Sequence, residues 1–541
     1  MSWQADKAVP LLAGEAFCEK PPLMYWFAAV PIRLFGAGAW AARLPNLLYA
    51  VITALGVGLL ARRSAGGRAG LVAAAAMSTF LLSYQVTVWL ATDAPLLASV
   101  SIALLGAYRG FYAAHTGERL RGYLLMHAAL GFGFLSKSAL AWLVPAMAVL
   151  TLAIWEKRWR ELFRWELYPG LLLQAAMIFV WVWFVYAGPD GTAHLKVFFW
   201  NNLVGRFAQI DAPNEIQYAT GHRNFPGKYL IELPVYLAPW TFLVIAALRR
   251  AWRERTVAFD EYRPVRFSLA ASLPPLLILS LAATARNIYF APALPGFALL
   301  LAWWSRELAT RLDRWDVLAL RATAALLFLG VLIFAVALGL IAADAWNTIG
   351  SHAQFVAIPA AGLAAAAALT HRAWKAARDN VLRSQWMLLL AYCVLLVAPA
   401  SQVYRQVDTW QDLKSIARAM ERDAAGRPVI LSAPDETTRA MIDMYARTHA
   451  ILIPGPPDAA AIDRLKGAAG TVPQSLVVAQ LPASASIAAQ SSARYLGLRQ
   501  GRPEHLPDGE PPPWAAAAGL RLARSYSLPN GRRYALLEPQ R

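Results

Sequence analysis

The chain contains few charged residues and almost no cysteine. Only 16% of its 541 residues are Asp, Glu, Lys or Arg, whereas soluble domains average about 25%. The hydrophobic fraction is 58%, and the mean hydropathy is +0.41. A membrane protein with several spanning segments is therefore expected. Of the two cysteines, Cys18 is predicted outside the membrane and Cys393 inside a membrane helix, so we expect no structural disulfide.

Several sequence signatures are also absent. Residues 1–20 are polar and lack the apolar core of a signal peptide. No Walker-type or dinucleotide-binding glycine pattern occurs, so no nucleotide is implied. The eight histidines are scattered, and no spacing of His, Cys and carboxylates matches a standard metal site. The net charge of +18 does not indicate nucleic acid, because the basic residues fall in short clusters between apolar runs.

Twelve apolar runs are candidate membrane helices. They lie near residues 43–61, 69–86, 93–108, 122–135, 139–155, 168–187, 229–248, 267–283, 287–304, 321–342, 355–370 and 385–400. Several are shorter than the roughly 20 residues of a full span, which predicts short or kinked helices. Every second connecting loop is rich in Arg and Lys, and these loops are predicted to be cytoplasmic. Twelve spans would then place both the N-terminus and the C-terminal region outside.

The predicted organisation is an all-α polytopic membrane domain followed by a small α/β soluble domain. Residues 1–42 form part of an outer loop and an interfacial helix, and residues 43–400 form the transmembrane domain. The polar outer loop 188–228 is long for a simple connection, which suggests a function. Residues 401–541 form the soluble domain on the outer side. Within it, a helix is expected over 418–423 and strands over 429–431, 475–478 and 533–537.

Ionisable residues at the outer ends of the predicted spans are candidate functional residues. A charged side chain at that depth costs free energy, so it is rarely found there without a function. Asp93, Lys137, Arg286 and Tyr289 lie between spans on the outer side, and Lys20 precedes an apolar, aromatic run. Cations gathered at a lipid interface suit a phosphate or pyrophosphate headgroup.

Four of these residues also have a structural interpretation. Lys20 could anchor the chain at the interface, and Asp93 could cap the following helix. Lys137 and Arg286 could be ordinary turn residues. Their shared position on one side of the membrane favours the functional interpretation.

The long outer loop supplies three further candidates. Arg206 could bind a phosphate with two parallel hydrogen bonds. His222 and Asn224 could bind sugar hydroxyls or order the loop, and a structural hydrogen bond is the favoured role for His222.

Short motifs between residue 9 and about residue 305 resemble the ArnT-like, protein-mannosyltransferase-like family of membrane glycosyltransferases. They are Gly14, Glu19-Lys20-Pro21-Pro22, Tyr25-Trp26, Ala41-Ala42-Arg43-Leu44-Pro45, Thr92-Asp93, Leu135-Ser136-Lys137, Asn201, Gly205-Arg206-Phe207, Pro239-Trp240, Arg286, Tyr289, Pro292 and Pro295. Their order and spacing carry the resemblance.

The resemblance implies a GT-C fold and a polyprenyl-phosphate sugar donor, commonly undecaprenyl phosphate in bacteria. It also implies transfer of aminoarabinose or another amino sugar to lipid A phosphates at the periplasmic face of the inner membrane, and it leaves a divalent cation open. Lys20 and Asp93 match positions near the donor phosphate. Arg206 and Tyr289 match positions that line the same cavity.

The chain departs from the family pattern at three places. Arg286 stands where many relatives have lysine, which keeps the charge, and Ser138 replaces the glycine that usually follows the lysine at position 137. The family also has a first helix and an acidic catalytic motif before the loop that contains Lys20. That acid is expected upstream of Met1, so Asp93 is the catalytic candidate within this chain.

The sequence therefore predicts a bacterial inner-membrane glycosyltransferase whose active site and C-terminal domain are periplasmic. Three alternatives stay open: a protein O-mannosyltransferase-like enzyme, a transporter of a lipid-linked sugar, and an inactive truncated homologue. The sequence shows no inverted repeats or paired broken helices, which argues against the transporter. A transferase yields a covalently modified acceptor, whereas a transporter only relocates its substrate.

Overall fold

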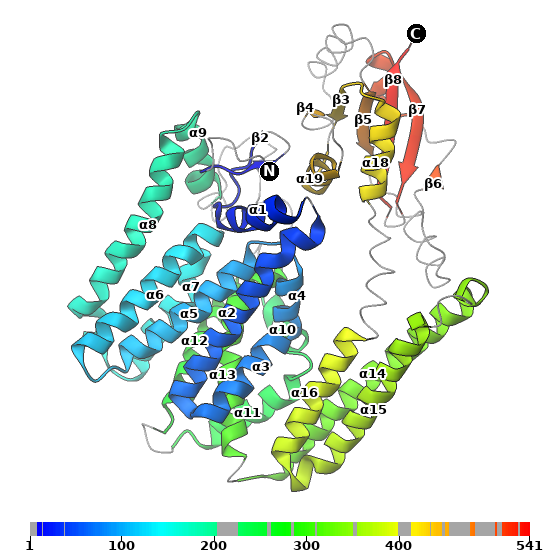
Figure 1. The fold of residues 1–541 in the computed structure, drawn as a ribbon. Helices are drawn as coiled ribbons and strands as arrows, with labels where there is room; N and C mark the ends of the chain where they lie inside the picture. The colour runs from blue at the N-terminus through cyan, green and yellow to red at the C-terminus, as the bar shows by residue number, and fades with distance from the viewer. Residues whose placement is uncertain are drawn as a thin grey trace. The chain divides into compact units, whose positions relative to one another are not determined.

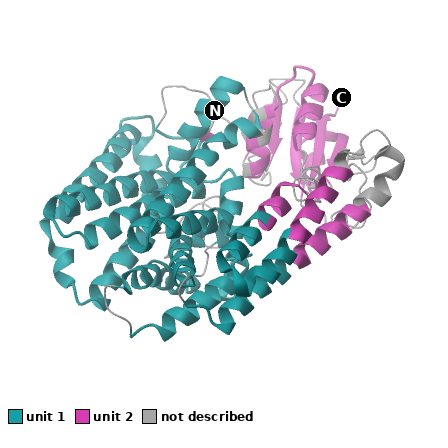
Figure 2. Cartoon of the chain, turned by 60° about the horizontal axis from the view of Figure 1, so that its bottom comes forward, with its two compact units in different colours: residues 1–10, 16–327, 369–390 teal, residues 11–15, 328–368, 391–541 magenta. Residues whose placement is uncertain are grey.

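The computed structural model describes most of the chain, which is mainly helical (Figure 1). The described residues are 8–12, 15–36, 38–202, 225–256, 261–282, 286–308, 311–349, 354–398, 413–432, 434–445, 450–453, 476–481, 504–505, 511–528 and 531–540. Figure 2 shows two compact units. Unit 1 holds residues 1–10, 16–327 and 369–390, and unit 2 holds residues 11–15, 328–368 and 391–541.

Each of the twelve predicted apolar segments contains helix. In chain order the helices are α1 (Leu23–Phe35), α2 (Ala39–Ala65), α3 (Gly67–Thr79), α4 (Leu81–Val88), α5 (Asp93–Phe111), α6 (Thr116–Lys137), α7 (Leu140–Trp155), α8 (Tyr168–Tyr186), α9 (Gly191–Leu195), α10 (Lys228–Tyr236), α11 (Thr241–Arg253), α12 (Arg263–Ser280), η7 (Asn287–Ala293), α13 (Leu294–Glu307), α14 (Arg314–Ile349), α15 (Gln354–Asp379) and α16 (Val381–Val397). The element η7 is a 3₁₀ helix that leads directly into α13.

Six helices in the described part of the chain are long and apolar enough to cross a membrane, or eight if each of two bent pairs is one span. The bent pairs are α3 with α4, at 63°, and α10 with α11, at 113°. Others, such as α7 and α16, are apolar but only 16 and 17 residues long. Short and kinked helices were predicted and are found. The count of twelve spans is not confirmed.

Glycines hold α5 and α6 at close range. A Cβ atom on Gly122 of α6 would lie 2.4 Å from the backbone nitrogen of Gly110 on α5, so only glycine permits this approach. The two helices follow one another and pack along their length as an antiparallel pair (Figure 1). The first residue of α5, Asp93, and the last residue of α6, Lys137, therefore lie at the same end of the bundle. We call this the outer end.

The opposite end of the bundle is basic. Arg109 lies in the last turn of α5 and Arg306 in the last turn of α13. Arg250 of α11 forms a buried ion pair with Asp316, at 2.5 Å between Nη2 and Oδ2. The indole of Trp304 donates to the other carboxylate oxygen of Asp316 at 3.0 Å. These bonds tie α11, α13 and the start of α14 together at this end.

Unit 2 contains a six-stranded mixed sheet in the order β4-β3-β5-β8-β7-β6. The strands are β3 (Val429–Ser432), β4 (Ala450–Ile453), β5 (Leu476–Leu481), β6 (Glu504–His505), β7 (Leu520–Ser527) and β8 (Arg533–Pro539). β3 pairs in parallel with β4 and β5, and the other neighbours are antiparallel.

Two helices, α18 (Leu413–Ala424) and α19 (Glu436–Tyr445), pack on one face of this sheet. Ile416 and Met420 of α18 and Ile442 of α19 share a buried cluster with Val429 and Leu431 of β3. The predicted helix and strands of this region are confirmed, and so is the small α/β fold. A separate ladder of two short strands, β1 (Leu11–Leu12) and β2 (Glu15–Ala16), lies near the start of the chain.

Candidate active site at the outer end

Three predicted site residues meet at the outer end of unit 1. The Nζ of Lys137 donates to Oδ1 of Asp93 in an ion pair whose side chains are only 7% and 2% exposed. The same ammonium lies 4.0 Å from the centre of the Tyr289 ring in η7. The carboxylate and the aromatic face both stabilise the cation. The sequence placed these residues on one side of the membrane, and the structure brings them into contact.

The pair formed by Asp93 and Lys137, which we call the buried ion pair, can still act on an anion. Removing two charges from water costs free energy even when they form an ion pair. The stability of the fold therefore does not by itself account for this pair. A lysine ammonium carries three N–H donors, and Lys137 gives one of them to Asp93. Its positive charge and remaining donors suit an anionic group that reaches this end of the bundle.

Tyr229 of α10 fixes the start of η7. Its side chain is fully buried, and its hydroxyl donates to the carbonyl of Arg286 at 2.5 Å. The backbone N–H of Tyr289 donates to the same carbonyl at 3.0 Å. These bonds hold the turn that carries Tyr289, whereas the Arg286 side chain is exposed. Sequence reasoning assigned no role to Tyr229, because a backbone acceptor 57 residues away leaves no local pattern.

The segment before Asp93 is anchored by α2. The amide of Asn46 donates to the carbonyls of Thr87, at 2.8 Å, and Trp89, at 2.7 Å. Arg43 adds a third bond to the same end of α4. Carbonyls at a helix end lack partners within the helix, so these side chains satisfy them. Arg43 belongs to a motif that carried the family resemblance without an assigned role, and Asn46 directly follows that motif.

Replacing Asn46 with alanine is expected to destabilise the protein by about 1–2 kcal/mol, because two part-buried carbonyls lose their donor. The measurement is the thermal unfolding temperature of the detergent-purified protein. Ser78→Ala is the matched control, since the exposed Ser78 hydroxyl bonds only within its own helix. Equal unfolding temperatures for the two variants would refute the anchoring role of Asn46.

The residue after Lys137 has a backbone conformation that favours glycine. Ser138 has φ 59° and ψ −149°, in a region that residues other than glycine rarely occupy. This explains why the family motif has glycine here: the chain must leave α6 with a positive φ directly after the lysine. The serine is a departure in side chain but not in backbone conformation.

Ser138→Gly is therefore expected to stabilise the protein by roughly 1 kcal/mol, because the strain relieved exceeds the added freedom of the unfolded chain. The unfolding temperature should rise, and the buried ion pair should be unaffected. Ser136→Gly is the control, because Ser136 lies inside α6, where glycine is unfavourable. A lower unfolding temperature for Ser138→Gly would contradict the strain at this position.

Lys20 precedes α1 in a segment packed against the outer end of α6. Cys18 and Leu23, on either side of it, share a buried cluster with Phe134, near the end of α6. Lys20 Nζ lies 3.9 Å from a carboxylate oxygen of Glu19 and donates to the Glu19 carbonyl at 3.4 Å. The side chain of Lys20 is 21% exposed. Its position at this end of unit 1 agrees with the sequence prediction.

The remaining predicted site residues cannot be placed. Arg206, His222 and Asn224 lie outside the residues that the structure describes. Across the described ranges, no group of three or more His, Cys, Asp or Glu side chains could hold a metal ion.

The comparisons with known proteins agree with the predicted resemblance. The family model for dolichyl-phosphate-mannose-protein mannosyltransferases matches residues 19–184. An undecaprenyl phosphate-α-4-amino-4-deoxy-L-arabinose arabinosyl transferase of Pseudomonas paraeruginosa is 31% identical over 333 residues, which are 61% of this chain and 57% of that protein. The transferase of the same name from Erwinia tasmaniensis is 32% identical over 54% of this chain and 51% of its own length.

A crystal structure of ArnT from Cupriavidus metallidurans bound to undecaprenyl phosphate has the same fold. Its TM-score is 0.66 at 16% sequence identity, and the match covers 98% of this chain and 90% of that one. The resemblance to the ArnT-like, protein-mannosyltransferase-like family and the GT-C fold are thereby confirmed. The sequence match spans little more than half the length of the curated relatives.

Proposed function

We propose, from this resemblance in sequence and fold, that the protein is a glycosyltransferase that uses a polyprenyl-phosphate sugar donor. The sugar is 4-amino-4-deoxy-L-arabinose, and the acceptor is lipid A or another lipid of the envelope. The names of the related transferases and the lipid bound to the related ArnT structure support the donor. The observation in this chain that carries the proposal is the buried ion pair under Tyr289, at the outer end of unit 1.

The proposed reaction is a single displacement at the anomeric carbon. An oxygen of the acceptor forms a bond to that carbon, and the bond from the carbon to the donor phosphate oxygen breaks. The electron pair of the broken bond stays on the oxygen of the departing polyprenyl phosphate, which gains negative charge. Fixed cations stabilise this charge where it develops. Lys20, Lys137, Arg206 and Arg286 are the proposed cations, and Tyr289 lines the same cavity.

Asp93 is the catalytic candidate in the described chain, and its contact with Lys137 suggests how it acts. Asp93 is proposed to hold the Lys137 ammonium in position through the hydrogen bond between them. The base that activates or orients the acceptor would be the acidic residue that the family resemblance implies. His222 and Asn224 are proposed to contact the sugar from the outer loop. The use of a divalent cation stays open, and no group of three or more His, Cys, Asp or Glu side chains in the described ranges would hold one.

The proposed location is the bacterial inner membrane, with the outer end in the periplasm. The arginines at the basic end of the bundle support this orientation through the positive-inside rule. We also propose the division into an outer segment at 1–42, a transmembrane domain at 43–400 and a periplasmic domain at 401–541. The exposed Leu34 and Phe35 of α1 support an interfacial helix in the first segment.

The test is transfer in a defined system. The natural full-length product is purified and incubated with undecaprenyl-phosphate aminoarabinose and lipid A, and the lipid A is analysed by mass spectrometry. A mass increase of one aminoarabinose residue is expected. If the donor only moves from one membrane leaflet to the other, and no acceptor gains mass, the protein is a transporter. If neither occurs, it is an inactive homologue.

Protein O-mannosylation is the second candidate, because the matching family model is that of mannosyltransferases acting on proteins. The same preparation, given a polyprenyl-phosphate mannose donor and a Ser/Thr-rich peptide, would then yield a mannosylated peptide. The share of the chain matched by the arabinosyl transferases is the larger one, so lipid A is the acceptor we favour.

A further inference from the structure

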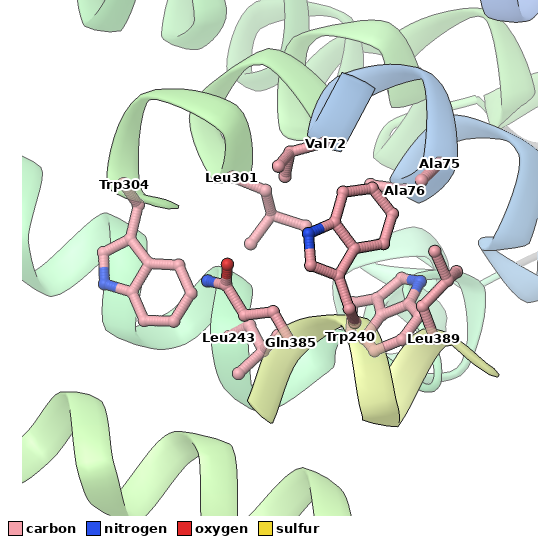
Figure 3. A pocket seen from close by; sticks show the side chains of 10 residues that line it. Val72, Ala75, Ala76, Trp240, Leu243, Leu301, Trp304, Gln385 and Leu389 are labelled. Carbon is pink, nitrogen blue, oxygen red and sulfur yellow. The ribbon is translucent and has the colours of Figure 1, made fainter. Parts of the chain in front are cut away.

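A second site lies in the basic half of unit 1, away from the buried ion pair. Helices α3, α11, α13 and α16 surround a partly open apolar pocket (Figure 3). All residues that line it belong to unit 1. Three of them are tryptophans, Trp240, Trp304 and Trp386, and two are small, Ala75 and Ala76. The small side chains on α3 leave open the space that the indoles on the other helices enclose.

The pocket walls are fixed and apolar. The indole N–H of Trp240 donates to Thr79 at 2.8 Å, and that of Trp304 donates to Asp316 at 3.0 Å. Both indoles therefore turn their hydrocarbon faces, rather than their N–H groups, toward the space. Figure 3 shows Gln385 between these two indoles. The carbonyl oxygen of its amide accepts from Ser305 at 2.7 Å, which leaves the amide N–H donors for another partner.

In the proposed orientation, the helix directions put the pocket in the cytoplasmic leaflet. α3 and α16 begin at the basic end, with Arg68 and Arg383 in their first turns, and α11 and α13 finish there. Trp304 is three residues from the end of α13, and Gln385 is four residues from the start of α16. At a rise of about 1.5 Å per residue, both lie within one or two turns of that end. The pocket therefore opens at the depth where phospholipid acyl chains begin.

Two arginines precede lining residues on the helices of the pocket. Arg68 lies four residues before the lining residue Val72 on α3, and Arg383 lies three residues before Trp386 on α16, so each shares a helix face with the lining. Both side chains are exposed. No ion pair within the described residues involves either of them. An apolar pocket, with arginines one turn away on two of its helices, matches the two parts of an anionic phospholipid.

We propose that this pocket binds one acyl chain of an anionic phospholipid from the cytoplasmic leaflet. The headgroup phosphate meets Arg68 and Arg383, and the amide of Gln385 donates to the glycerol ester. The lipid fills the space between the α3–α13 pair and the part of α16 up to residue 390, all of it within unit 1. The proposal does not depend on the transferase activity, because the pocket and the outer end lie in opposite halves of the bundle.

The test is photo-crosslinking in nanodiscs with a phosphatidylglycerol that carries a diazirine on one acyl chain. In the unchanged protein, adducts are expected on the peptides that contain Val72 and Gln385. Ala75→Phe fills the pocket and should reduce these adducts at least tenfold. The double variant R68A/R383A should reduce them roughly tenfold, because each arginine contributes a few-fold to headgroup binding. A phosphatidylcholine probe with the same chains should label these peptides weakly.

The matched control is R121A/R160A, which removes two other exposed arginines, one in α6 and one in the 3₁₀ helix Trp159–Phe163. It should label like the unchanged protein. Equal labelling in R68A/R383A and this control, or labelling that persists in Ala75→Phe, would overturn the proposal. Unlabelled undecaprenyl phosphate should not compete. If it removes the adducts in proportion to its concentration, the pocket holds the donor's isoprenoid tail and the phospholipid proposal is wrong.

Discussion

Lys20→Ala is expected to reduce transfer to lipid A by about 10²–10³-fold while the amount of folded protein stays the same. The proposed role of Lys20 is to stabilise the charge on the departing phosphate, an interaction that strengthens as the donor bond breaks. Its side chain is 21% exposed, and the Glu19 carboxylate 3.9 Å from it is 24% exposed, so solvent still reaches the carboxylate that loses this contact. The measurement is the initial rate of modified lipid A formation, compared at equal protein concentration.

The control for this variant is Lys196→Ala. Lys196 is an exposed lysine in the helical turns that follow α8, also on the predicted outer side, but it has no proposed contact with the donor. It should keep the rate of the unchanged protein. Full activity in Lys20→Ala at a normal protein level would refute the phosphate-binding role. Lys20→Arg should recover part of the rate, because the charge remains while the geometry changes.

Asp93→Asn is expected to destabilise the protein by about 3–5 kcal/mol, because it leaves the Lys137 ammonium buried without its counter-ion. Transfer should also fall to the background level. The measurement is the thermal unfolding temperature in detergent, followed by tryptophan fluorescence. Asp190→Asn is the matched control. Asp190 is an exposed aspartate with a positive φ of 51°, a conformation that asparagine also tolerates, so its unfolding temperature should not change.

The double variant D93N/K137M separates stability from function. Removing both charges eliminates the unpaired buried ion, so much of the lost stability should return. Transfer should stay absent, because the cation that faces the donor is gone. If D93N/K137M regains both stability and transfer, the buried ion pair is only a packing contact and its catalytic role is wrong.

The helices could be read from the sequence, whereas their exact spans could not. Long apolar runs bounded by arginines predict helices well, because an unsatisfied backbone is excluded from a membrane. The bends could not be placed. The 113° break between α10 and α11 depends on how Pro239 and Trp240 pack in the bundle, including the bond from the Trp240 indole to Thr79. In the sequence, the apolar run continues through such a bend without interruption, so the bend leaves no signal.

The candidate site was partly predictable for a similar reason. Asp93, Lys137 and Tyr289 were identified because charged or phenolic groups are conspicuous at the ends of apolar helices. Their mutual contacts require the close approach of α5 and α6, which the spacing of Gly106 and Gly110 on α5 could have suggested. Asn46 and Tyr229 had no such signal, because both bind backbone carbonyls far away in the chain.

The glycine motif after Lys137 shows how a sequence departure can be understood once the backbone is known. From the sequence, Ser138 only weakens the family match. In the structure, position 138 has the positive φ that explains the glycine of the relatives. Position 138 therefore keeps the backbone conformation expected of the family motif, although its side chain differs. The lysine keeps the position that this turn gives it, at the end of α6 beside Asp93.

The most direct test of the proposed transferase is the mass of lipid A recovered after incubation of the purified full-length product with undecaprenyl-phosphate aminoarabinose. We expect lipid A that has gained one aminoarabinose residue. Lys196→Ala should preserve the rate of this transfer, and Lys20→Ala should lower it by about 10²–10³-fold. Unmodified lipid A, from a preparation whose unfolding temperature shows that it is folded, would contradict the proposal that this protein transfers the sugar.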